Sequence, residues 1–303
     1  MSDQPAAPAL PKFLDLPPAQ PLGGTRWSRR YAAPRRTRLA GVTWRHVSNA
    51  VVHPDGHVAE DDAALTEQDA AVLPLPAGGG VTIGQFLTGP LAAAYQAGLT
   101  LPFCGAPLSP RQTDILAKIG ALRGYIALAA PRRFTSVTAP EITAGAPGPF
   151  TKQLADFLRA PEAAAKIRAA ILPRRETEKF CLTNRASLTA WLRAKQVAVI
   201  DPETTRLSDL QSLLASASLV ILADPAQSGL LGLCAAGTKI LEIAPEGWLG
   251  LDARVMSAHF GLDWQPFLAA PPSYPLQGPL PFGSLVPCSF DVPIRELAKV
   301  LEK

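Results

Sequence analysis

The sequence predicts an α/β protein whose C-terminal half is built on a doubly wound parallel sheet. Three apolar runs carry this prediction: VAVI at 197–200, LVILA at 219–223 and KILEI at 239–243. They are continuous rather than alternating, which is typical of strands buried on both faces of a sheet. Segments of helical composition lie between them, and strands that alternate with helices form parallel sheets covered on both sides.

Size and composition fit this fold class. The chain has 303 residues, of which 48% are hydrophobic and 18% charged, so it is long enough for one large domain or two ordinary ones and too apolar for a disordered protein. Changes in composition predict three parts: a lead-in rich in proline and arginine at 1–35, an N-terminal α/β domain at 36–148 and a C-terminal domain at 149–303. The proposed linker is the stretch ITAGAPGPF at 142–150.

The first half has a mixed pattern. Strands are expected within 39–60, where PDGH marks a turn, and the glycine-rich stretch LPLPAGGG at 73–80 interrupts regular structure. A helix is expected at 84–98 and a strand at 99–105. A second helix begins with Ser109 as its cap and Pro110 at its first position, and a strand follows at 125–131.

The second half alternates more regularly. Residues 150–170 are interpreted as mostly helical, and strands are expected at 178–183, 197–200, 219–223 and 239–243. Helices are expected at 187–196, at 209–217 with Ser208 as cap, at 228–237 and at 251–261. The tail from 265 is proline-rich and ends in a strand-like piece and a short amphipathic helix.

Ligands of such sheets bind beyond the carboxyl ends of the strands. Four loops therefore become candidates, at 183–185, 201–204, 224–229 and 244–247. In the first, Arg185 is suited to a bidentate phosphate contact, although it also fits a solvated helix start. In the third, Ser228 and Gly229 open a predicted helix whose free N–H groups would bind phosphate.

Two carboxylates have two interpretations each. Asp224, at the end of a buried strand, is suited to act as a base or to hold a ribose hydroxyl, but it also fits the cap of a helix with Pro225 at its first position. Glu242 lies inside the apolar run KILEI, where a carboxylate is costly unless it is paired. It would bind a nucleotide hydroxyl, or it would end the strand and pair with a basic residue.

The spacing of the histidines and cysteines argues against a metal site. The four histidines and four cysteines show no metal-binding spacing, so we expect no catalytic metal. The absence of a signal peptide and of a long apolar run, with scattered cysteines, favours the cytoplasm.

The net charge is +4, and seven arginines fall between 26 and 45 without an intervening acid. Without a nucleic-acid reading module, this arm is interpreted as packing along the domain or as meeting an anionic membrane face or glycan.

The order of elements resembles glycosyltransferase family 61, often described as capsular polysaccharide biosynthesis proteins. The resemblance rests on FCLTNR, DLQSLLASASLVI, LCAAGTKILEIAP and DVPIRELAKVL, with looser agreement at WRHVSNAVVHPDGHVAE and SPRQTDILAKIGAL. It implies two Rossmann-like domains facing a cleft, the GT-B arrangement, and a nucleotide-sugar donor held mainly by the C-terminal domain. Gly237, Thr238 and Glu242 belong to the block that resembles the donor segment of the family.

Two functions follow from this resemblance. The first is transfer of a sugar from a nucleotide-sugar to a glycan acceptor, with helix N-termini and Arg185 stabilising the leaving diphosphate. The second is a catalytically degenerate homologue that serves as a partner of another glycosyltransferase in polysaccharide assembly. It is favoured because the family's His-Gly falls on Asp224-Pro225 and its loop Asn on Leu230. A dinucleotide-dependent enzyme is disfavoured, since no GxGxxG follows a predicted strand.

Overall fold

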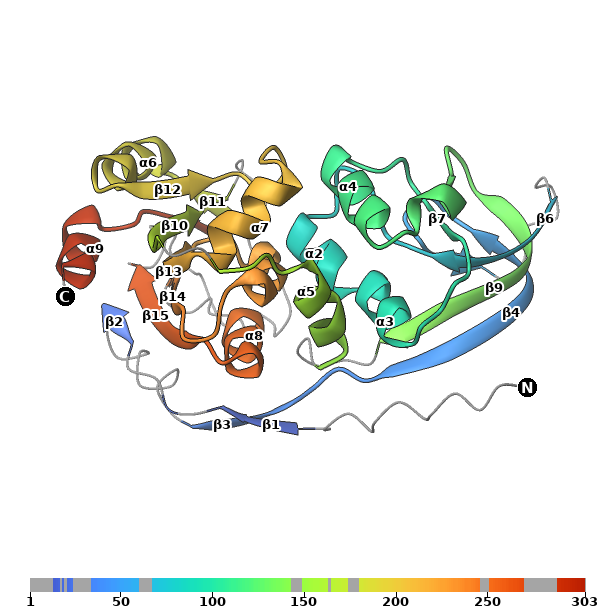
Figure 1. Ribbon diagram of the computed structural model, residues 1–303, viewed down its shortest axis with the longest axis horizontal. Coiled ribbons are helices and arrows are strands. Elements are labelled where there is room, and N and C mark those ends of the chain that lie inside the picture. The colour runs from blue at the N-terminus through green and yellow to red at the C-terminus, as the bar shows by residue number, and fades with distance from the viewer. Residues whose placement is uncertain are drawn as a thin grey trace, which may run out of the picture.

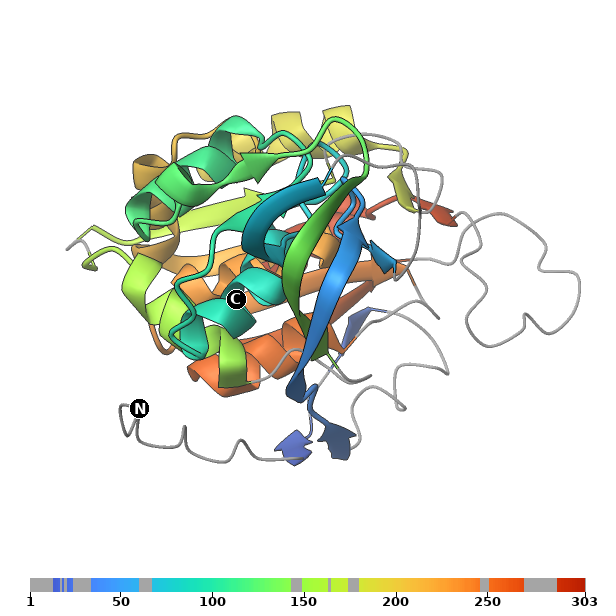
Figure 2. The same cartoon turned by 90° about the vertical axis from the view of Figure 1, so that its right-hand side faces the viewer.

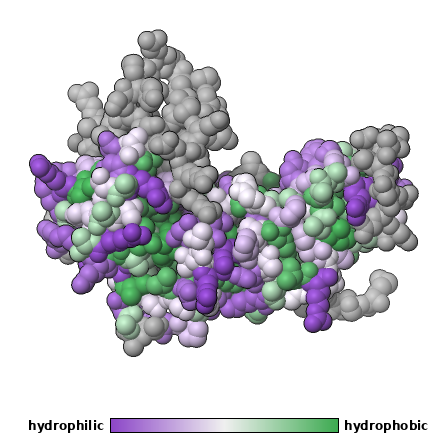
Figure 3. Space-filling model, turned by 90° about the horizontal axis from the view of Figure 1, so that it is seen from above, coloured by the Kyte–Doolittle hydropathy of each residue, from purple (hydrophilic) through white to green (hydrophobic). Residues whose placement is uncertain are grey.

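The computed structural model describes residues 13–16, 18, 21–23, 34–59, 67–142, 149–162, 165–173, 180–245, 251–269 and 288–302. Within these ranges the chain forms two six-stranded sheets and two short two-stranded ribbons. Each large sheet belongs to one lobe of an elongated molecule (Figure 1). From above, a continuous surface that mixes polar and apolar residues joins the lobes (Figure 3).

The sheet of the C-terminal lobe has the strand order β12-β10-β13-β14-β15-β2, and all of its pairings are parallel. From β10 onward, the next strand along the chain, β12, lies on one side of β10, whereas β13, β14 and β15 follow on its other side. This order reverses direction between β10 and β13. The strands are β10 (Ile167–Ile171), β12 (Val197–Ile200), β13 (Ala217–Leu222), β14 (Lys239–Pro245), β15 (Asp263–Ala269) and β2 (Leu22–Gly23).

Helices cover both faces of this sheet, which confirms the predicted α/β class and parallel sheet. One face packs against α6 (Arg185–Ala194) and α9 (Ile294–Leu301) through buried leucines of both helices. The other face packs against α7 (Leu207–Ala215), α8 (Asp252–Phe260) and the 3-10 helix η3 (Pro225–Leu233). The apolar runs at 197–200, 219–223 and 239–243 are therefore strands because side chains on both of their faces are removed from water.

Several sequence predictions in this lobe are wrong. The alanine-rich stretch at 167–171 is strand β10, not helix, because it lies between β12 and β13 and is buried on both faces. The strand expected at 178–183 is present as β11 (Phe180–Leu182), but it pairs with β16 (Cys288–Phe290) outside the main sheet. Ser208 lies inside α7, whose cap position is Arg206. β15 occupies the start of the tail, and β2 adds part of the lead-in to the sheet edge.

The sheet of the N-terminal lobe is mixed, with the order β5-β4-β9-β6-β7-β8. β9, β6, β7 and β8 run parallel, whereas β4 pairs antiparallel with both β9 and β5. The paired strands β4 and β9 form a long curved ribbon (Figure 2). The bounds are β4 (Val42–Val52), β5 (Val58–Ala59), β6 (Glu67–Pro74), β7 (Phe103–Gly105), β8 (Ile126–Ala127) and β9 (Arg132–Ile142).

Local sequence signals account for the helices of this lobe. Ser109 caps α4 (Pro110–Lys118) through a capping box with Gln112, as its position before Pro110 predicts. The helix expected at 84–98 is present as α2 (Ile83–Thr88) and α3 (Pro90–Gln96). Pro90 separates the two because it cannot donate a backbone hydrogen bond.

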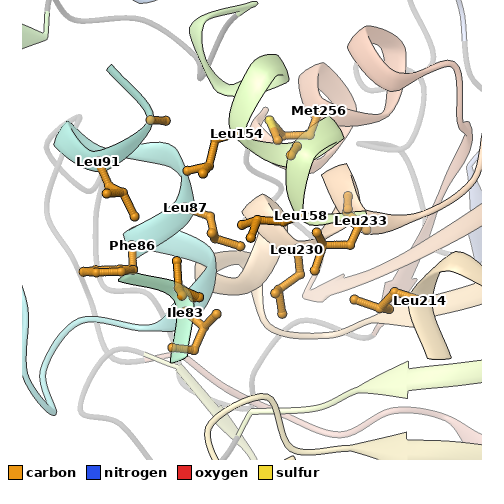
Figure 4. Packing of buried hydrophobic residues seen from close by; sticks show 14 of the residues in the cluster. Ile83, Phe86, Leu87, Leu91, Leu154, Leu158, Leu214, Leu230, Leu233 and Met256 are labelled. Atoms are coloured by element: carbon orange, nitrogen blue, oxygen red, sulfur yellow. The ribbon is translucent and has the colours of Figure 1, made fainter. Parts of the chain in front are cut away.

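The two lobes share one hydrophobic core. Ile83, Phe86 and Leu87 of α2 belong to the same buried cluster as Leu230 and Leu233 of η3. Figure 4 shows Leu87 pointing toward Leu230 and toward Leu158 of α5 (Lys152–Leu158), the helix that follows the proposed linker. Residues 143–148 of that linker lie outside the described residues. The shared core means that separating the lobes would expose a large apolar surface to water.

Candidate functional site

The carboxyl ends of parallel strands from both lobes meet at α2. This helix follows β6 of the N-terminal lobe, and it packs on η3, which follows β13 of the C-terminal lobe. The Thr82 hydroxyl donates a hydrogen bond to the carbonyl oxygen of Ala226 (2.8 Å). The loop at 224–229, predicted from the sequence to bind phosphate, is thus a contact between the two lobes.

Acceptors from the C-terminal lobe satisfy the first N–H groups of α2. The Ile83 N–H donates to Oε1 of Glu203 (3.0 Å), and the Gly84 N–H donates to Oε1 of Gln227 (2.9 Å). Nε2 of Gln227 donates to the same Glu203 oxygen (3.3 Å). A carboxylate is favoured at a helix N-terminus because unpaired N–H groups and the helix dipole attract negative charge. Glu203 and Gln227 therefore join the lobes by hydrogen bonds as well as by packing.

We expect Glu203→Ala to lower the free energy of unfolding by about 1–2 kcal/mol, because the Ile83 N–H and the Gln227 amide lose a half-buried acceptor. Urea unfolding measures this change. Glu302→Ala is the matched control, since the Glu302 side chain is 65% exposed and its ion pair with Lys195 is long at 3.4 Å. Equal stabilities of the two variants would contradict the proposed role of Glu203.

Two glycines allow α2 and η3 to come this close. A Cβ added at Gly229 would lie 2.1 Å from the carbonyl oxygen of Gly84, and one added at Gly84 would lie 2.5 Å from Cα of Gln227. Both approaches are far below van der Waals contact and involve backbone atoms, which cannot move aside cheaply. Ser228 is also buried. The structure therefore places Ser228 and Gly229 against the other lobe.

Asp224 caps η3, as one of its two interpretations predicted. Its carboxylate accepts a hydrogen bond from the Ala226 N–H (3.1 Å), with Pro225 at the first position of the helix. Burial raises the pKa of this carboxyl, the Ala226 N–H lowers it, and the charge of Glu203 raises it further. Asp224 remains partly exposed just after β13, so it stays accessible at the carboxyl edge of the sheet although it caps η3.

Glu242 is a buried carboxyl in the middle of β14. It is 3% exposed, and one of its oxygens accepts a hydrogen bond from Nε1 of Trp264 (2.8 Å). Burial raises the pKa of Glu242 to about 8; the Trp264 hydrogen bond lowers it and the charge of Asp252 raises it. The Arg254 guanidinium lies over the Trp264 ring, 5.1 Å from its centroid. Glu242 therefore pairs with an indole N–H on the next strand, a partner that the sequence analysis missed.

Arg185 is the first residue of α6, so it forms a helix start, one of its two interpretations, two residues before the start predicted at 187. Its Nε donates to the carbonyl oxygen of Pro173 (2.6 Å), just after the carboxyl end of β10. The neighbouring Asn184 exchanges two hydrogen bonds with the backbone of Val292, which holds the start of α6 to the C-terminal tail. These bonds fix Arg185 near the carboxyl end of β10.

Gly237 and Thr238 lie at the opposite edge, before the amino end of β14. Gly237 adopts a left-handed conformation (φ 80°) that favours glycine. The Thr238 hydroxyl donates to the carbonyl oxygens of Ala217 and Ala235 and so fixes this turn to the start of β13. The block AAGTKILEI, the best single match to the family pattern, thus combines a structural turn with a buried strand.

The same amino-terminal edge borders a cavity of about 590 Å³ whose lining includes Ser218, Lys239, Asp263 and Val300. It lies away from Arg185 and Asp224. Doubly wound sheets hold ligands at the carboxyl edge, so we assign the candidate site to that edge rather than to this cavity.

The sequence offered only partial signals for the residues that join the lobes. Glu203 and Gln227 lie in two of the four loops selected from the sequence, but nothing in the sequence indicated their partner. Gly84 and Gly229, glycines inside predicted helices, were the local signs of a close approach. Glu246 and Gly247 of the fourth loop lie outside the described residues.

No protein-family model matches this sequence, and no curated protein matches it. Within the described ranges, no three or more His, Cys, Asp or Glu side chains are grouped so that they could hold a metal ion. None of the helices in those ranges has the length and apolar character needed to cross a membrane.

Proposed function

We propose that this protein is a glycosyltransferase of glycan or polysaccharide biosynthesis that uses a nucleotide-sugar donor. The observation that carries the proposal is the placement of Arg185 and Asp224 on the two sides of the point where the strand order reverses. Ile171 and Leu222 are register partners at the ends of β10 and β13. Pro173, whose carbonyl oxygen accepts the hydrogen bond from Arg185, lies just after Ile171, and Asp224 lies just after Leu222. A crevice outside two such strands is where doubly wound sheets hold nucleotides.

In this proposal Arg185 binds the donor diphosphate, since a guanidinium forms paired hydrogen bonds with phosphate oxygens. Asp224, across the reversal point, holds a ribose hydroxyl or accepts a proton from the acceptor. Burial raises the pKa of Asp224 above its ordinary value, which is the direction that favours a proton acceptor. The acceptor glycan would approach from the N-terminal lobe, whose parallel strands point their carboxyl ends at the same junction. Together the lobes would form a GT-B-like pair with a closed contact at α2.

The proposed location is the cytoplasm. Cys104 and Cys234 are free and buried, which is compatible with a reducing compartment.

A second function is favoured by a separate observation, the packing of the loop at 224–229. Gly229 lies against the Gly84 backbone and Ser228 is buried, so the residues expected to bind phosphate in this loop are enclosed by the protein itself. A homologue that no longer binds a donor there would serve as a non-catalytic partner of another glycosyltransferase. Co-purification with an active transferase would support this alternative.

Titration calorimetry with UDP, GDP and CMP separates the two functions. We expect one nucleotide to bind and Arg185→Ala to weaken that binding about tenfold or more, because a charge-assisted phosphate contact is lost. Arg193→Ala, in the last turn of the same helix, removes the same charge at an exposed position and should leave binding unchanged.

Turnover of a panel of nucleotide-sugars completes the test. Release of nucleotide that Asp224→Asn abolishes would support the enzyme, whereas an intact chain that binds no nucleotide would exclude it. Binding without turnover would favour the non-catalytic partner.

A further inference from the structure

We propose that the two-stranded ribbon formed by β1 (Phe13–Leu16) and β3 (Arg35–Arg38) is a docking element for an anionic lipid surface. The ribbon belongs to neither large sheet, and its strands pair antiparallel with Phe13 opposite Arg38 and Asp15 opposite Arg36. Figures 1 and 2 both place it on the outside of the molecule, below α8. This inference does not depend on the donor site.

The inner face of the ribbon attaches it to the C-terminal lobe. Leu16 is buried in a small cluster with Leu39, which follows β3, and with Val255 of α8, and Leu14 packs against the same cluster. Thr37, which lies opposite Leu14, is buried as well. Since successive side chains of a strand point to opposite faces, the residues between these point outward.

The outer face combines an exposed aromatic ring with arginines. Phe13 is 50% exposed, one of the larger exposed fractions among apolar side chains in the described chain. The Arg36 guanidinium lies 4.9 Å from the centre of its ring, and Arg38 is exposed directly opposite it. Arg35 is also exposed, but it pairs with Leu16 on the inner side of the ribbon and its charge acts on Arg254 of α8, so it does not belong to this face. An apolar side chain flanked by arginines suits a membrane interface, where the ring enters the headgroup boundary and the guanidinium groups meet lipid phosphates.

Charge complementarity favours lipid headgroups over a neutral partner. On the outer face two arginines, Arg36 and Arg38, accompany a single acid, Asp15, whose side chain is 84% exposed and lies 3.8 Å from Nε of Arg36. A basic segment near an anionic bilayer gains about fivefold in binding for each arginine. The exposed Phe13 ring favours a bilayer over a polyanion such as nucleic acid or an acidic glycan, because only the bilayer offers an apolar layer beneath its charges.

The test is co-sedimentation of the full chain with vesicles of phosphatidylcholine, with and without phosphatidylserine. We expect binding only to the anionic vesicles and a decrease with salt. Arg36→Ala/Arg38→Ala should weaken binding by about one order of magnitude or more, and Phe13→Ala should weaken it several-fold. Asp15→Asn should strengthen it, because the only acid of the ribbon is lost. The matched control is Arg193→Ala/Arg295→Ala, which removes two exposed arginines from α6 and α9.

Three results would overturn the proposal: no binding to anionic vesicles, an equal loss in the control variant, or tighter binding to heparin or single-stranded DNA than to vesicles. The second would mean that overall charge alone attracts the protein, and the third that the ribbon binds polyanions. Phe13→Trp provides a readout that loss of folding cannot imitate. Its added fluorescence, relative to the parent protein, should be quenched by brominated lipid only when vesicles are anionic.

Discussion

Gly229→Ala is expected to lower the free energy of unfolding by about 3 kcal/mol or more, the largest effect of any single methyl group in the interface between the lobes. The new Cβ would lie 2.1 Å from the carbonyl oxygen of Gly84 and 2.7 Å from the Thr88 side chain. Relief requires α2 and η3 to move apart, which weakens the hydrogen bonds of Glu203 and Gln227 and loosens the shared core. Thermal and urea unfolding measure the loss.

Gly80→Ala is the matched control for this substitution. A Cβ at Gly80 meets nothing within 4 Å, and the residue lies in the loop that leads to α2. We expect a change of no more than about 0.5 kcal/mol. If Gly229→Ala were as mild as Gly80→Ala, the close approach of α2 and η3 would be wrong, and the loop at 224–229 would again be available to a phosphate.

Glu242→Gln is expected to stabilise the protein at neutral and alkaline pH and to flatten its dependence on pH. The folded-state pKa of Glu242 is raised from 4.5 to about 8, so the folded protein holds a proton that the unfolded chain has released. The contribution of Glu242 to the free energy of unfolding is fully present below pH 4.5 and decreases as the pH rises toward 8. The slope is about 1.4 kcal/mol per pH unit where only the folded state is protonated.

Glutamine keeps an oxygen that accepts the Trp264 N–H but has no proton to lose. Urea unfolding at pH 5, 7 and 9 should therefore show a decline for the parent protein that is smaller in Glu242→Gln. Glu296→Gln, an exposed carboxylate on α9, serves as control and should follow the parent curve. Parallel curves for the parent and Glu242→Gln would mean that the carboxyl is ionised in the folded state, with a cation as its partner.

Local sequence signals sufficed for much of the secondary structure. The cap formed by Ser109 before Pro110 and the uninterrupted apolar run VAVI located α4 and β12 closely, because both patterns depend on neighbouring residues. The alanine-rich segment IRAAI was misread as helix, since alanine favours helices and only its position between β12 and β13 makes it a strand. β2 was missed because its two residues are a strand only through pairing with β15.

The candidate site, too, is predicted in part by the sequence and in part decided by the tertiary structure. The sequence alone determined that the loop with Asp224 follows a buried strand, because chain order fixes the end at which each strand stops. It placed Arg185 after the strand at 178–183, which lies outside the main sheet, and only the tertiary structure brings Arg185 to Pro173 beyond β10. Only the tertiary structure decided that Gly229 contacts Gly84 rather than open space, that Glu203 binds the N-terminus of α2 and that Trp264 pairs with Glu242. The two lobe contacts join residues more than one hundred positions apart, and Glu242 and Trp264 lie on different strands. Such pairings depend on the shared core that brings the two lobes together and on strand register, and no local pattern encodes either.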